Sequence, residues 1–330
     1  MPAEALLELK GVKTFFRVGR GLLKAVNGVD MAIRQGETVG LVGESGCGKS
    51  TLGRTIMRLH RPESGQVLFK GRDVWSYGRP ERKQYAKEVQ MIFQDPSASL
   101  DPLMVIHDCV SEGLRIHGAR SKSERYERAV ELLGTVGLSK EHANRFPHEF
   151  SGGQRQRVGI ARALALRPEL IVCDEPISAL DVSIQAQIVN LLKKLQVEMG
   201  LAYLFITHDL SMVRQIADRI AVMYLGSIME MAPSGRLYAR HRHPYTEALL
   251  SAIPIADPDV EAKRRRILLA GDVASPVGLG SECGFRKRCP RATELCGRER
   301  PALAEVEPGH FVACHRLGGQ APNPNPNGAG

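Results

Sequence analysis

One short glycine-rich stretch constrains this chain more than any other. Residues 43–51 read Gly-Glu-Ser-Gly-Cys-Gly-Lys-Ser-Thr, which fits the P-loop pattern of two spaced glycines followed by lysine and a hydroxyl residue. The apolar run 37–42 precedes this stretch, and residues 49–59 follow it with helix-compatible spacing. Strand, glycine loop and helix together predict a polyphosphate held by backbone N–H groups and by the positive end of the helix dipole.

The residue types in this loop have distinct expected tasks. Lys49 would reach the terminal phosphates, and the Ser50 hydroxyl would ligate Mg²⁺. Cys47 lies close to Lys49 and to the helix start, both of which lower a thiol pKa. We therefore expect alkylation of Cys47 to inactivate the protein and a bound nucleotide to protect it. The full set expected to contact the nucleotide here is Gly43, Ser45, Gly46, Cys47, Gly48, Lys49, Ser50 and Thr51.

Length and composition narrow the class of protein. The chain has 330 residues, which favours one large domain plus a smaller one. It has no apolar run long enough to span a membrane and no signal-peptide pattern at its start, so we expect a cytoplasmic protein that depends on other chains if it acts at a membrane. The net charge of +9 is spread along the sequence, which favours a solvated surface or an anionic membrane surface over a nucleic-acid face.

Acidic and polar residues follow several short apolar runs. Residues 170–174 form such a run ending in Asp174, with Glu175 next; residues 202–207 form another, followed by His208. Ligands bind at the carboxyl ends of strands in open α/β sheets. Asp174 suits Mg²⁺, Glu175 could polarise a water, and His208 is expected at the same site.

The remaining segments complete a coarse map. Residues 4–39 alternate short apolar runs with turns and predict antiparallel strands, among which Phe16 is either a core aromatic or the ring on which an adenine stacks. We expect helices within 105–137 and over 182–199, and a hairpin from runs 220–225 and 227–231. Ser151, ahead of an apolar helix, is either an ordinary N-cap or a second anion-binding helix start.

In their order and spacing, these motifs resemble the nucleotide-binding subunits of ABC transporters across residues 4–250. The P-loop matches the family's Walker A motif, residues 170–174 its Walker B motif, and residues 178–181, ending in Asp181, its D-loop. Residues matching the other motifs are Gln94 of the Q-loop, His208 of the switch, the signature residues Ser151, Gly152, Gly153 and Gln154, and Phe16 near the adenine-stacking position. Phe150 stands where leucine is commoner in the family.

This resemblance implies a P-loop NTPase (RecA-like) α/β core with an N-terminal antiparallel β subdomain, an inserted helical subdomain and ATP hydrolysis between two head-to-tail cassettes. Each ATP would lie between one subunit's Walker A loop and the other's signature segment. Glu175 would be the general base, His208 would hold the γ-phosphate and water, Lys49 would contact phosphate, and Gln94 would sense Mg²⁺ and the membrane subunit. Ser50, Gln94 and Asp174 would therefore hold the Mg²⁺.

Residues 243–254, which begin His-Pro-Tyr, resemble a segment of the ATPases that serve oligopeptide and dipeptide importers, and residues 271–276 and 283–290 extend that resemblance. It implies two integral membrane permease subunits, a second and paralogous ATPase subunit, an extracytoplasmic peptide-binding protein, and a peripheral position on the cytoplasmic face of the membrane. Import of nickel, glutathione or another small solute is the alternative. A soluble ABC ATPase acting on ribosomes or DNA is the rival from another class.

Four of the seven cysteines crowd the C-terminal part: Cys283, Cys289, Cys296 and Cys314. Their spacing lacks the close Cys pairs of zinc sites, whereas four thiolates from one loop-rich stretch suit a 4Fe–4S cluster. The resemblance to peptide importers points the same way, with zinc and free or disulfide-linked cysteines as alternatives. We expect an ABC ATPase domain over 1–255 with a helical insertion near 97–157, a Cys-rich extension over 256–318, and a disordered tail over 319–330.

Overall fold

The computed structural model of the chain describes residues 5–19, 21–118, 121–178, 180–254, 267–269, 271 and 277–317. Its main sheet has the strand order β11-β12-β10-β9-β3-β8-β7-β6. The strands are β3 (Thr38–Val42), β6 (Val89–Ile92), β7 (Leu170–Asp174), β8 (Ala202–Thr207), β9 (Arg219–Tyr224), β10 (Ser227–Pro233), β11 (Ala304–Glu307) and β12 (His310–Val312). The five strands from β9 to β6 run parallel, and the three at the other edge pair antiparallel.

Strand β3 lies between β8 and β9 and carries the P-loop at its carboxyl end. All residues of β3, β7 and β8 are buried, as expected for parallel strands covered on both faces. The predicted hairpin of runs 220–225 and 227–231 is confirmed as β9 and β10. A buried parallel sheet with helices beside it is the α/β core that the sequence predicts.

A second, antiparallel sheet is built from the N-terminal segment, with the order β2-β1-β4-β5. Its strands are β1 (Ala5–Val18), β2 (Gly21–Arg34), β4 (Ser64–Phe69) and β5 (Arg72–Asp73). The apolar runs on either side of Gly11 were expected to be separated by a turn, but they form one strand with a register shift between Leu9 and Val12. Gly11 has a φ of 55°, and its N–H donates to Asp30 Oδ1 at 2.7 Å, so the chain bulges there and continues.

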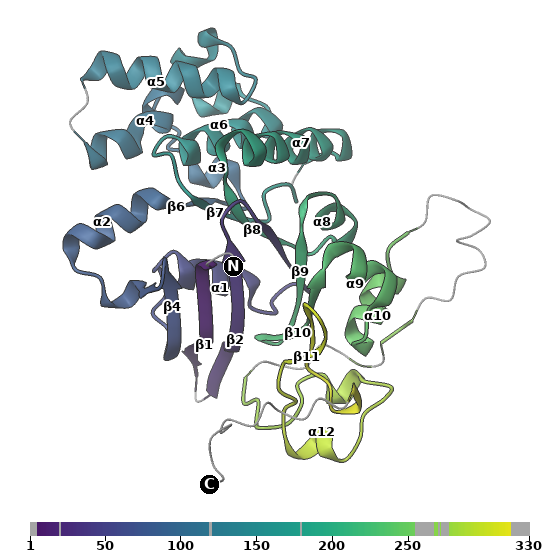
Figure 1. The fold of residues 1–330 in the computed structure, drawn as a ribbon. Helices are drawn as coiled ribbons and strands as arrows, with labels where there is room; N and C mark the ends of the chain where they lie inside the picture. The colour runs from purple at the N-terminus through teal and green to yellow at the C-terminus, as the bar shows by residue number, and fades with distance from the viewer. Residues whose placement is uncertain are drawn as a thin grey trace.

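The helices divide into groups (Figure 1). They are α1 (Lys49–Ile56), α2 (Arg79–Glu88), α3 (Pro96–Ser99), α4 (Ile106–His117), α5 (Lys122–Thr135), α6 (Gly152–Leu164), α7 (Val182–Met199), α8 (Leu210–Ile216), α9 (Ser234–Arg240), α10 (Pro244–Ser251) and α12 (Leu295–Arg298). Helices α3 to α7 gather at one end of the molecule, beyond the sheets. Helix α7 has the predicted bounds, and the predicted helical stretch 105–137 contains α4 and α5.

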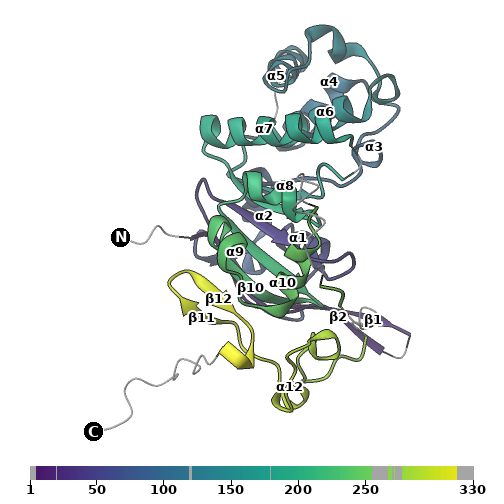
Figure 2. The same ribbon diagram turned by 90° about the vertical axis from the view of Figure 1, so that its right-hand side faces the viewer.

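Residues 277–317, here called the C-terminal module, lie at the opposite end from the helical group (Figure 2). The module contains α12, the short 3₁₀ helix η4 (Arg286–Arg288) and the β11–β12 hairpin, and β12 adds to the edge of the main sheet by pairing with β10. Most of residues 256–276 and the predicted disordered tail 319–330 lie outside the described residues. Among the residues described, no helix combines the length and apolar character needed to cross a bilayer.

Candidate nucleotide site

The P-loop joins β3 to α1 in a conformation that two glycines make accessible. Gly43 has a φ of 157°, and a Cβ there would lie 2.1 Å from the Met223 carbonyl oxygen. Gly48 has a φ of 108°, and a Cβ there would lie 1.9 Å from the Ala25 carbonyl oxygen. The loop therefore packs against β9 and β2 at distances that only glycine permits.

Lys49 and Ser50 lie on the first turn of α1, which begins directly after Gly48. The Lys49 ammonium donates to the carbonyls of Gly43 at 2.8 Å and Glu44 at 2.9 Å, so it is held within the loop. The Ser50 hydroxyl donates to Asp174 Oδ1 at 2.7 Å. The hydroxyl of Walker A and the carboxylate of Walker B are therefore adjacent, as their proposed shared Mg²⁺ requires.

Asp174 ends β7 and is buried. Burial raises the pKa of its carboxyl, while the hydrogen bond from Ser50 and the nearby Arg54 and Lys49 charges lower it. Oxygen ligands from a hydroxyl and a carboxylate are the set that Mg²⁺ prefers, and a divalent cation here would stabilise the buried carboxylate. The residues present fit a magnesium ion.

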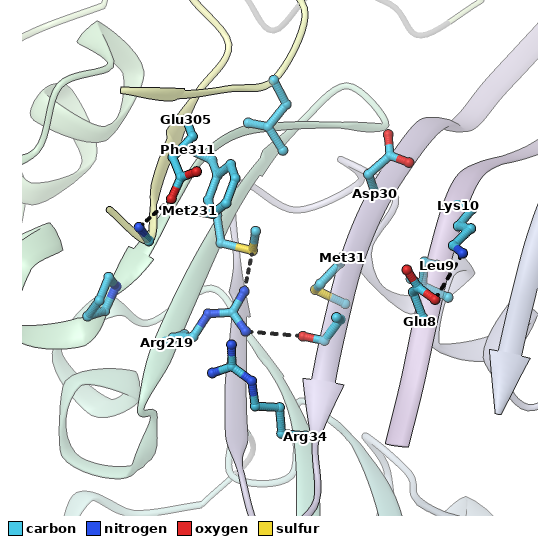
Figure 3. Close-up of a pocket in the computed structure, with 14 residues that line it drawn as sticks. Glu8, Leu9, Lys10, Asp30, Met31, Arg34, Arg219, Met231, Glu305 and Phe311 are labelled. Atoms are coloured by element: carbon cyan, nitrogen blue, oxygen red, sulfur yellow. Dashed lines mark hydrogen bonds and ion pairs between the residues drawn. The ribbon is translucent and has the colours of Figure 1, made fainter. Parts of the chain in front are cut away.

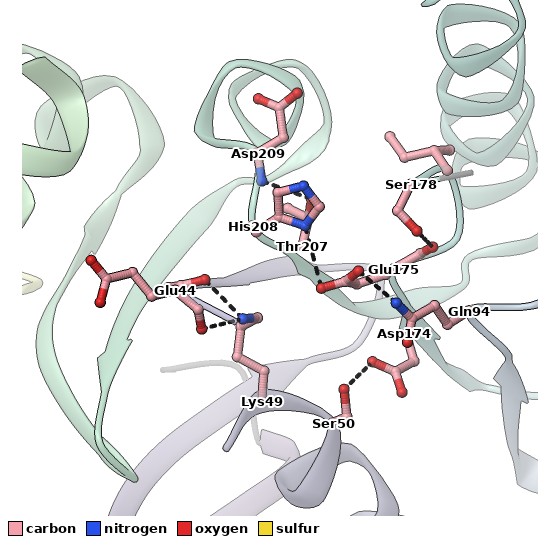
Figure 4. A network of polar contacts seen from close by, with 12 residues as sticks. Glu44, Lys49, Ser50, Gln94, Asp174, Glu175, Ser178, Thr207, His208 and Asp209 are labelled. Atoms are coloured by element: carbon pink, nitrogen blue, oxygen red, sulfur yellow. Dashed lines mark hydrogen bonds and ion pairs between the residues drawn. The ribbon is translucent and has the colours of Figure 1, made fainter. Parts of the chain in front are cut away.

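Glu175 brings two further motif residues together (Figure 4). Its Oε2 accepts a hydrogen bond from Gln94 Nε2 at 2.9 Å, and its Oε1 lies 3.4 Å from His208 Nδ1. The backbone of Glu175 has a φ of 45°, a left-handed conformation that costs a non-glycine residue about 1–3 kcal/mol. Its N–H donates to the Ile206 carbonyl on β8 at 3.0 Å, which holds the residue in this conformation.

A cavity of about 220 Å³ lies over this arrangement. It is lined by Phe16, Leu23, Ala25, Ser45, Gly46, Gly48, Lys49, Ser50, Thr51, Gln94 and Glu175. Phe16 stands on β1 at the cavity wall, where its ring meets the edge of His60 with centroids 5.2 Å apart. It is therefore a partly exposed wall residue, and its role in stacking an adenine remains a prediction.

The signature residues do not line this cavity. Ser151 caps α6: its Oγ accepts from Gln154 N at 3.4 Å, and its own N–H donates to Gln154 Oε1 at 3.0 Å, forming a capping box. Ser151 and Gly152 are exposed, and Asp181 stands exposed at the N-terminus of α7 without a side-chain cap. Of the two alternatives for Ser151, the N-cap is observed, and anion binding at this helix start stays a prediction. None of the signature residues lines the cavity over the chain's own P-loop.

The prediction of an acidic thiol at Cys47 is wrong. Cys47 is only 4% exposed, and burial raises the pKa of its thiol, outweighing the lowering by Lys49. The Lys49 ammonium, 3.8 Å from Cys47 Sγ, is already engaged by two carbonyls. The sequence correctly predicted that Cys47 lies near a cation, but its side chain is buried and does not line the nucleotide cavity.

The four late cysteines lie in one part of the C-terminal module. Burial raises the pKa of Cys283 to about 11, and the neighbouring Cys296, Cys289 and Cys314 contribute to the rise. Cys283 and Cys296 are also joined through a backbone hydrogen bond of 2.9 Å. Within the described residues, no three His, Cys, Asp or Glu side chains are grouped so as to hold a metal ion.

A larger cavity, of about 740 Å³, lies in the seam between the N-terminal sheet and the edge strands β10 and β12 (Figure 3). None of the predicted motif residues lines it. Its Lys10 is ion-paired with Glu8 at 3.2 Å, and Arg219 is bonded to Ala32 O at 3.3 Å and to Glu37 at 3.1 Å. We therefore regard this cavity as part of the packing between the two sheets.

Sequence reasoning gave no role to Glu44 of the P-loop or to the two residues that contact it, Tyr245 and Arg288. The Arg288 guanidinium forms a bidentate salt bridge with the Glu44 carboxylate, with N–O distances of 2.8 and 3.1 Å. The Glu44 N–H donates to Tyr245 Oη at 3.1 Å. Tyr245 belongs to the His-Pro-Tyr segment, which the sequence did single out, but Glu44 occupies a variable position of the P-loop pattern. No local pattern indicates the Glu44–Arg288 pair.

Two family models match the chain. Residues 26–178 match the model described as ABC transporter, and residues 229–296 match the model described as oligopeptide/dipeptide transporter, C-terminal region. The first match contains the P-loop, Gln94, the signature residues and Glu175, and the second contains Tyr245 and Arg288 together with three of the four late cysteines.

Similar proteins agree with these matches. The chain is 57% identical to a putative oligopeptide transport ATP-binding protein, YkfD, of Bacillus subtilis over 94% of this chain and 95% of that protein. It is 55% identical to the oligopeptide transport ATP-binding protein OppF of the same organism over 94% and 96%, and 52% identical to a putative peptide import ATP-binding protein of Brucella ovis over 96% and 99%.

Among solved structures, the ATP-binding cassette MJ0796, described as a dimeric post-hydrolysis state bound to ADP and Pi, superposes with a TM-score of 0.64 at 34% identity. The match covers 69% of this chain and 98% of that one. A cbiO1 protein from Clostridium perfringens, part of an ABC transporter complex, superposes equally at 27% identity, over 72% of this chain and 92% of that one. Fold, motif geometry and relatives together place this chain in the family of ABC transporter ATP-binding proteins, with the C-terminal region of the oligopeptide/dipeptide group.

Proposed function

We propose that this chain is the ATP-hydrolysing subunit of an importer that takes up di- or oligopeptides through partner membrane subunits. The observation that carries the proposal is the match of residues 229–296 to the oligopeptide/dipeptide C-terminal region, because the ATPase motifs alone are shared by ABC proteins with other cargoes. Import of nickel, glutathione or another small solute is the second candidate. The rival of a soluble ATPase acting on ribosomes or DNA has no support among these matches.

The proposed chemistry follows from the contacts around Glu175. Lys49 would leave its loop carbonyls to contact the terminal phosphates of ATP, and Ser50, Asp174 and Gln94 would hold the Mg²⁺ that neutralises phosphate charge. Glu175 would orient and deprotonate the attacking water as general base, and His208 would fix the γ-phosphate beside it. Gln94 and His208 already flank the Glu175 carboxylate, so small rotations would release it toward a water.

The position of the signature segment supports a two-chain site. Ser151, Gly152, Gly153, Gln154 and Asp181 lie outside the cavity lined by this chain's own P-loop, so we propose that they serve the ATP held by a second ATPase subunit. A paralogous second subunit, two permease subunits on the cytoplasmic face of the membrane and an extracytoplasmic peptide-binding protein would complete the complex. In hydrolysis the protein mainly positions groups and stabilises charge, so a partner's segment can be essential without being a base.

Replacing Glu175 by glutamine tests the assigned base. MgATP should bind Glu175→Gln with wild-type affinity, while hydrolysis by the assembled complex should fall by about 10²–10⁴-fold. Glu198→Gln, on the exposed side of α7, is the matched control and should keep wild-type turnover. Near wild-type hydrolysis by Glu175→Gln would refute the assignment.

The cargo is tested with the complex reconstituted in vesicles with its binding protein. We expect candidate peptides to stimulate hydrolysis and to accumulate inside. If nickel or glutathione stimulates hydrolysis and no peptide does, the second candidate replaces the first.

For the four late cysteines we propose a 4Fe–4S cluster, with zinc as the alternative. The support is their spacing in the sequence and their location in one module. In the described residues they are not grouped closely enough to hold a metal ion, so the proposal requires the module to rearrange around the cluster. Iron and sulfide analysis of anaerobically purified protein, with absorbance near 400 nm that Cys289→Ser abolishes, would support the cluster. Equimolar zinc without iron would contradict it.

A further inference from the structure

The C-terminal module contacts both walls of the nucleotide cavity. One wall is the P-loop, through Glu44, and the other is the β1–β2 hairpin, which supplies Phe16, Leu23 and Ala25 to the cavity. These two contacts involve different parts of the module, residues 277–279 and residue 288.

On the P-loop side, Glu44 is fixed in three directions. Its carbonyl accepts from Lys49, its N–H donates to Tyr245, and its carboxylate is bound by Arg288. Arg288 is 9% exposed and Tyr245 is fully buried, so both partners are held by their own packing. Two of the three groups that fix this loop residue therefore come from the chain beyond the cassette motifs.

Arg288 is set apart from its neighbours in η4. Arg286 and Lys287 are exposed, whereas Arg288 is turned inward, with its guanidinium 5.8 Å from the centre of the Tyr224 ring. Tyr224 in turn packs on Tyr245 and Phe285, with ring centroids 4.8 and 5.3 Å apart. An aromatic cluster thus joins the end of β9, helix α10 and the module behind the P-loop.

On the hairpin side, the module adds to the edge of β2. Val277 forms a β-bridge with Leu23, which lies directly opposite Phe16 in the β1–β2 register. The Gly278 N–H donates to the Leu22 carbonyl at 3.2 Å, and Lys24 Nζ donates to the Leu279 carbonyl at 2.5 Å. The strand that carries the cavity wall is therefore held by backbone contacts from the module.

We propose that the C-terminal module is a positioning element of the ATP site, and that Arg288 transmits the state of the module to the P-loop through Glu44. The bidentate pair fixes the loop in direction as well as distance, because a planar guanidinium matches both carboxylate oxygens. Loosening the module, by loss of a bound group or by modification of its cysteines, then weakens nucleotide binding. This coupling concerns the cassette itself and holds whichever solute the complex carries.

The test measures MgADP binding to the full chain by calorimetry. We expect Arg288→Ala to raise the dissociation constant about fivefold or more, the lower range of measured couplings between sites. Arg288→Lys should recover part of the lost MgADP affinity, because lysine keeps the positive charge but lacks the planar guanidinium that binds both carboxylate oxygens. Arg291→Ala is the matched control: Arg291 lies in the same module and pairs with Glu247 on α10 at 2.7 Å, away from the loop, so affinity should stay within about twofold of wild type.

A second arm separates positioning from folding. Glu44→Gln leaves the module intact and should weaken MgADP binding as Arg288→Ala does, and the double variant should be no worse than either single variant. Coupling between two sites is reciprocal, so bound nucleotide should also stabilise the module. Saturating MgADP should therefore slow modification of the half-buried Cys289 and Cys314 in the wild type and not in Arg288→Ala, and mass spectrometry of the labelled peptides measures both rates.

Wild-type MgADP affinity in both Arg288→Ala and Glu44→Gln would overturn the proposal. Additive losses in the double variant would also overturn it, because two independent effects would then be at work.

Discussion

Replacing Glu230 by alanine tests the buried contact that unites the main sheet, helix α10 and the C-terminal module. Glu230 lies on β10 and is fully buried. Its carboxylate accepts from the backbone N–H groups of Arg242 at 2.7 Å and His243 at 3.0 Å, and Oε1 also lies 2.7 Å from His310 Nε2. One side chain thus satisfies three polar groups from two segments, residues 242–243 and residue 310.

The magnitude follows from what Glu230→Ala leaves behind. Two backbone donors and one imidazole lose their acceptor in a place that water does not reach, and each such group costs about 1–3 kcal/mol. With three such groups near the lower end of that range, we expect the free energy of unfolding to fall by about 3–5 kcal/mol.

Urea unfolding followed by circular dichroism measures this loss. Glu198→Ala is the matched control, because Glu198 lies at the exposed end of α7 in an ion pair with Lys194 and is 52% exposed; its loss should stay within about 0.5 kcal/mol. A loss below about 1 kcal/mol in Glu230→Ala would refute the reasoning, since the three donors would then have found other partners.

Two further predictions follow from buried titratable groups. Cys47 should react with iodoacetamide more slowly than the half-buried Cys314 at neutral pH, because burial raises the pKa of the Cys47 thiol and keeps it protonated. Peptide mass spectrometry measures both rates, and faster labelling of Cys47 would contradict its buried position. Burial lowers the pKa of His243 to about 4, whereas the same side chain in the unfolded chain accepts a proton near pH 6.5. The resulting stability is fully present above pH 6.5 and should be lost as the pH falls toward 4, by up to about 3 kcal/mol. His243→Asn, which keeps an acceptor for the Tyr245 N–H, should flatten this dependence in urea titrations; an unchanged slope would show that other groups cause it.

The sequence predicted the part of the nucleotide site whose residues lie close together in the chain or at the ends of apolar strands. The P-loop conformation depends on glycines and a helix start within a few residues. Asp174 ends an apolar strand, and Glu175 and His208 each directly follow one. Parallel strands bring their carboxyl ends to one edge, so residues that end different strands meet there without any knowledge of long-range contacts. The Glu175 contacts to Gln94 and His208 are the direct result.

The features that sequence reasoning missed depend on tertiary packing. The pair Glu44–Arg288 joins residues 244 positions apart, and neither residue carries a pattern that marks it. The Cys47 pKa could not be predicted from its neighbours in sequence, because the deciding factor is burial against other segments. The single long strand β1 replaced two short ones because Gly11, which resembles a turn residue, is accommodated by a bulge and a bond to Asp30 on the neighbouring strand.

The pairing of β12 with β10 has a consequence for how this chain can be shortened. An open sheet edge exposes unpaired backbone groups that recruit other strands, and the module covers the β10 edge with a short hairpin whose outer strand, β11, carries Glu305 and Glu307. A chain cut between the cassette and this hairpin would uncover the edge of β10 and remove His310 from the Glu230 carboxylate at the same time. Strands β11 and β12 therefore protect the sheet edge against aggregation. A shortened chain should be designed to end after β12 instead of after the last ATPase motif.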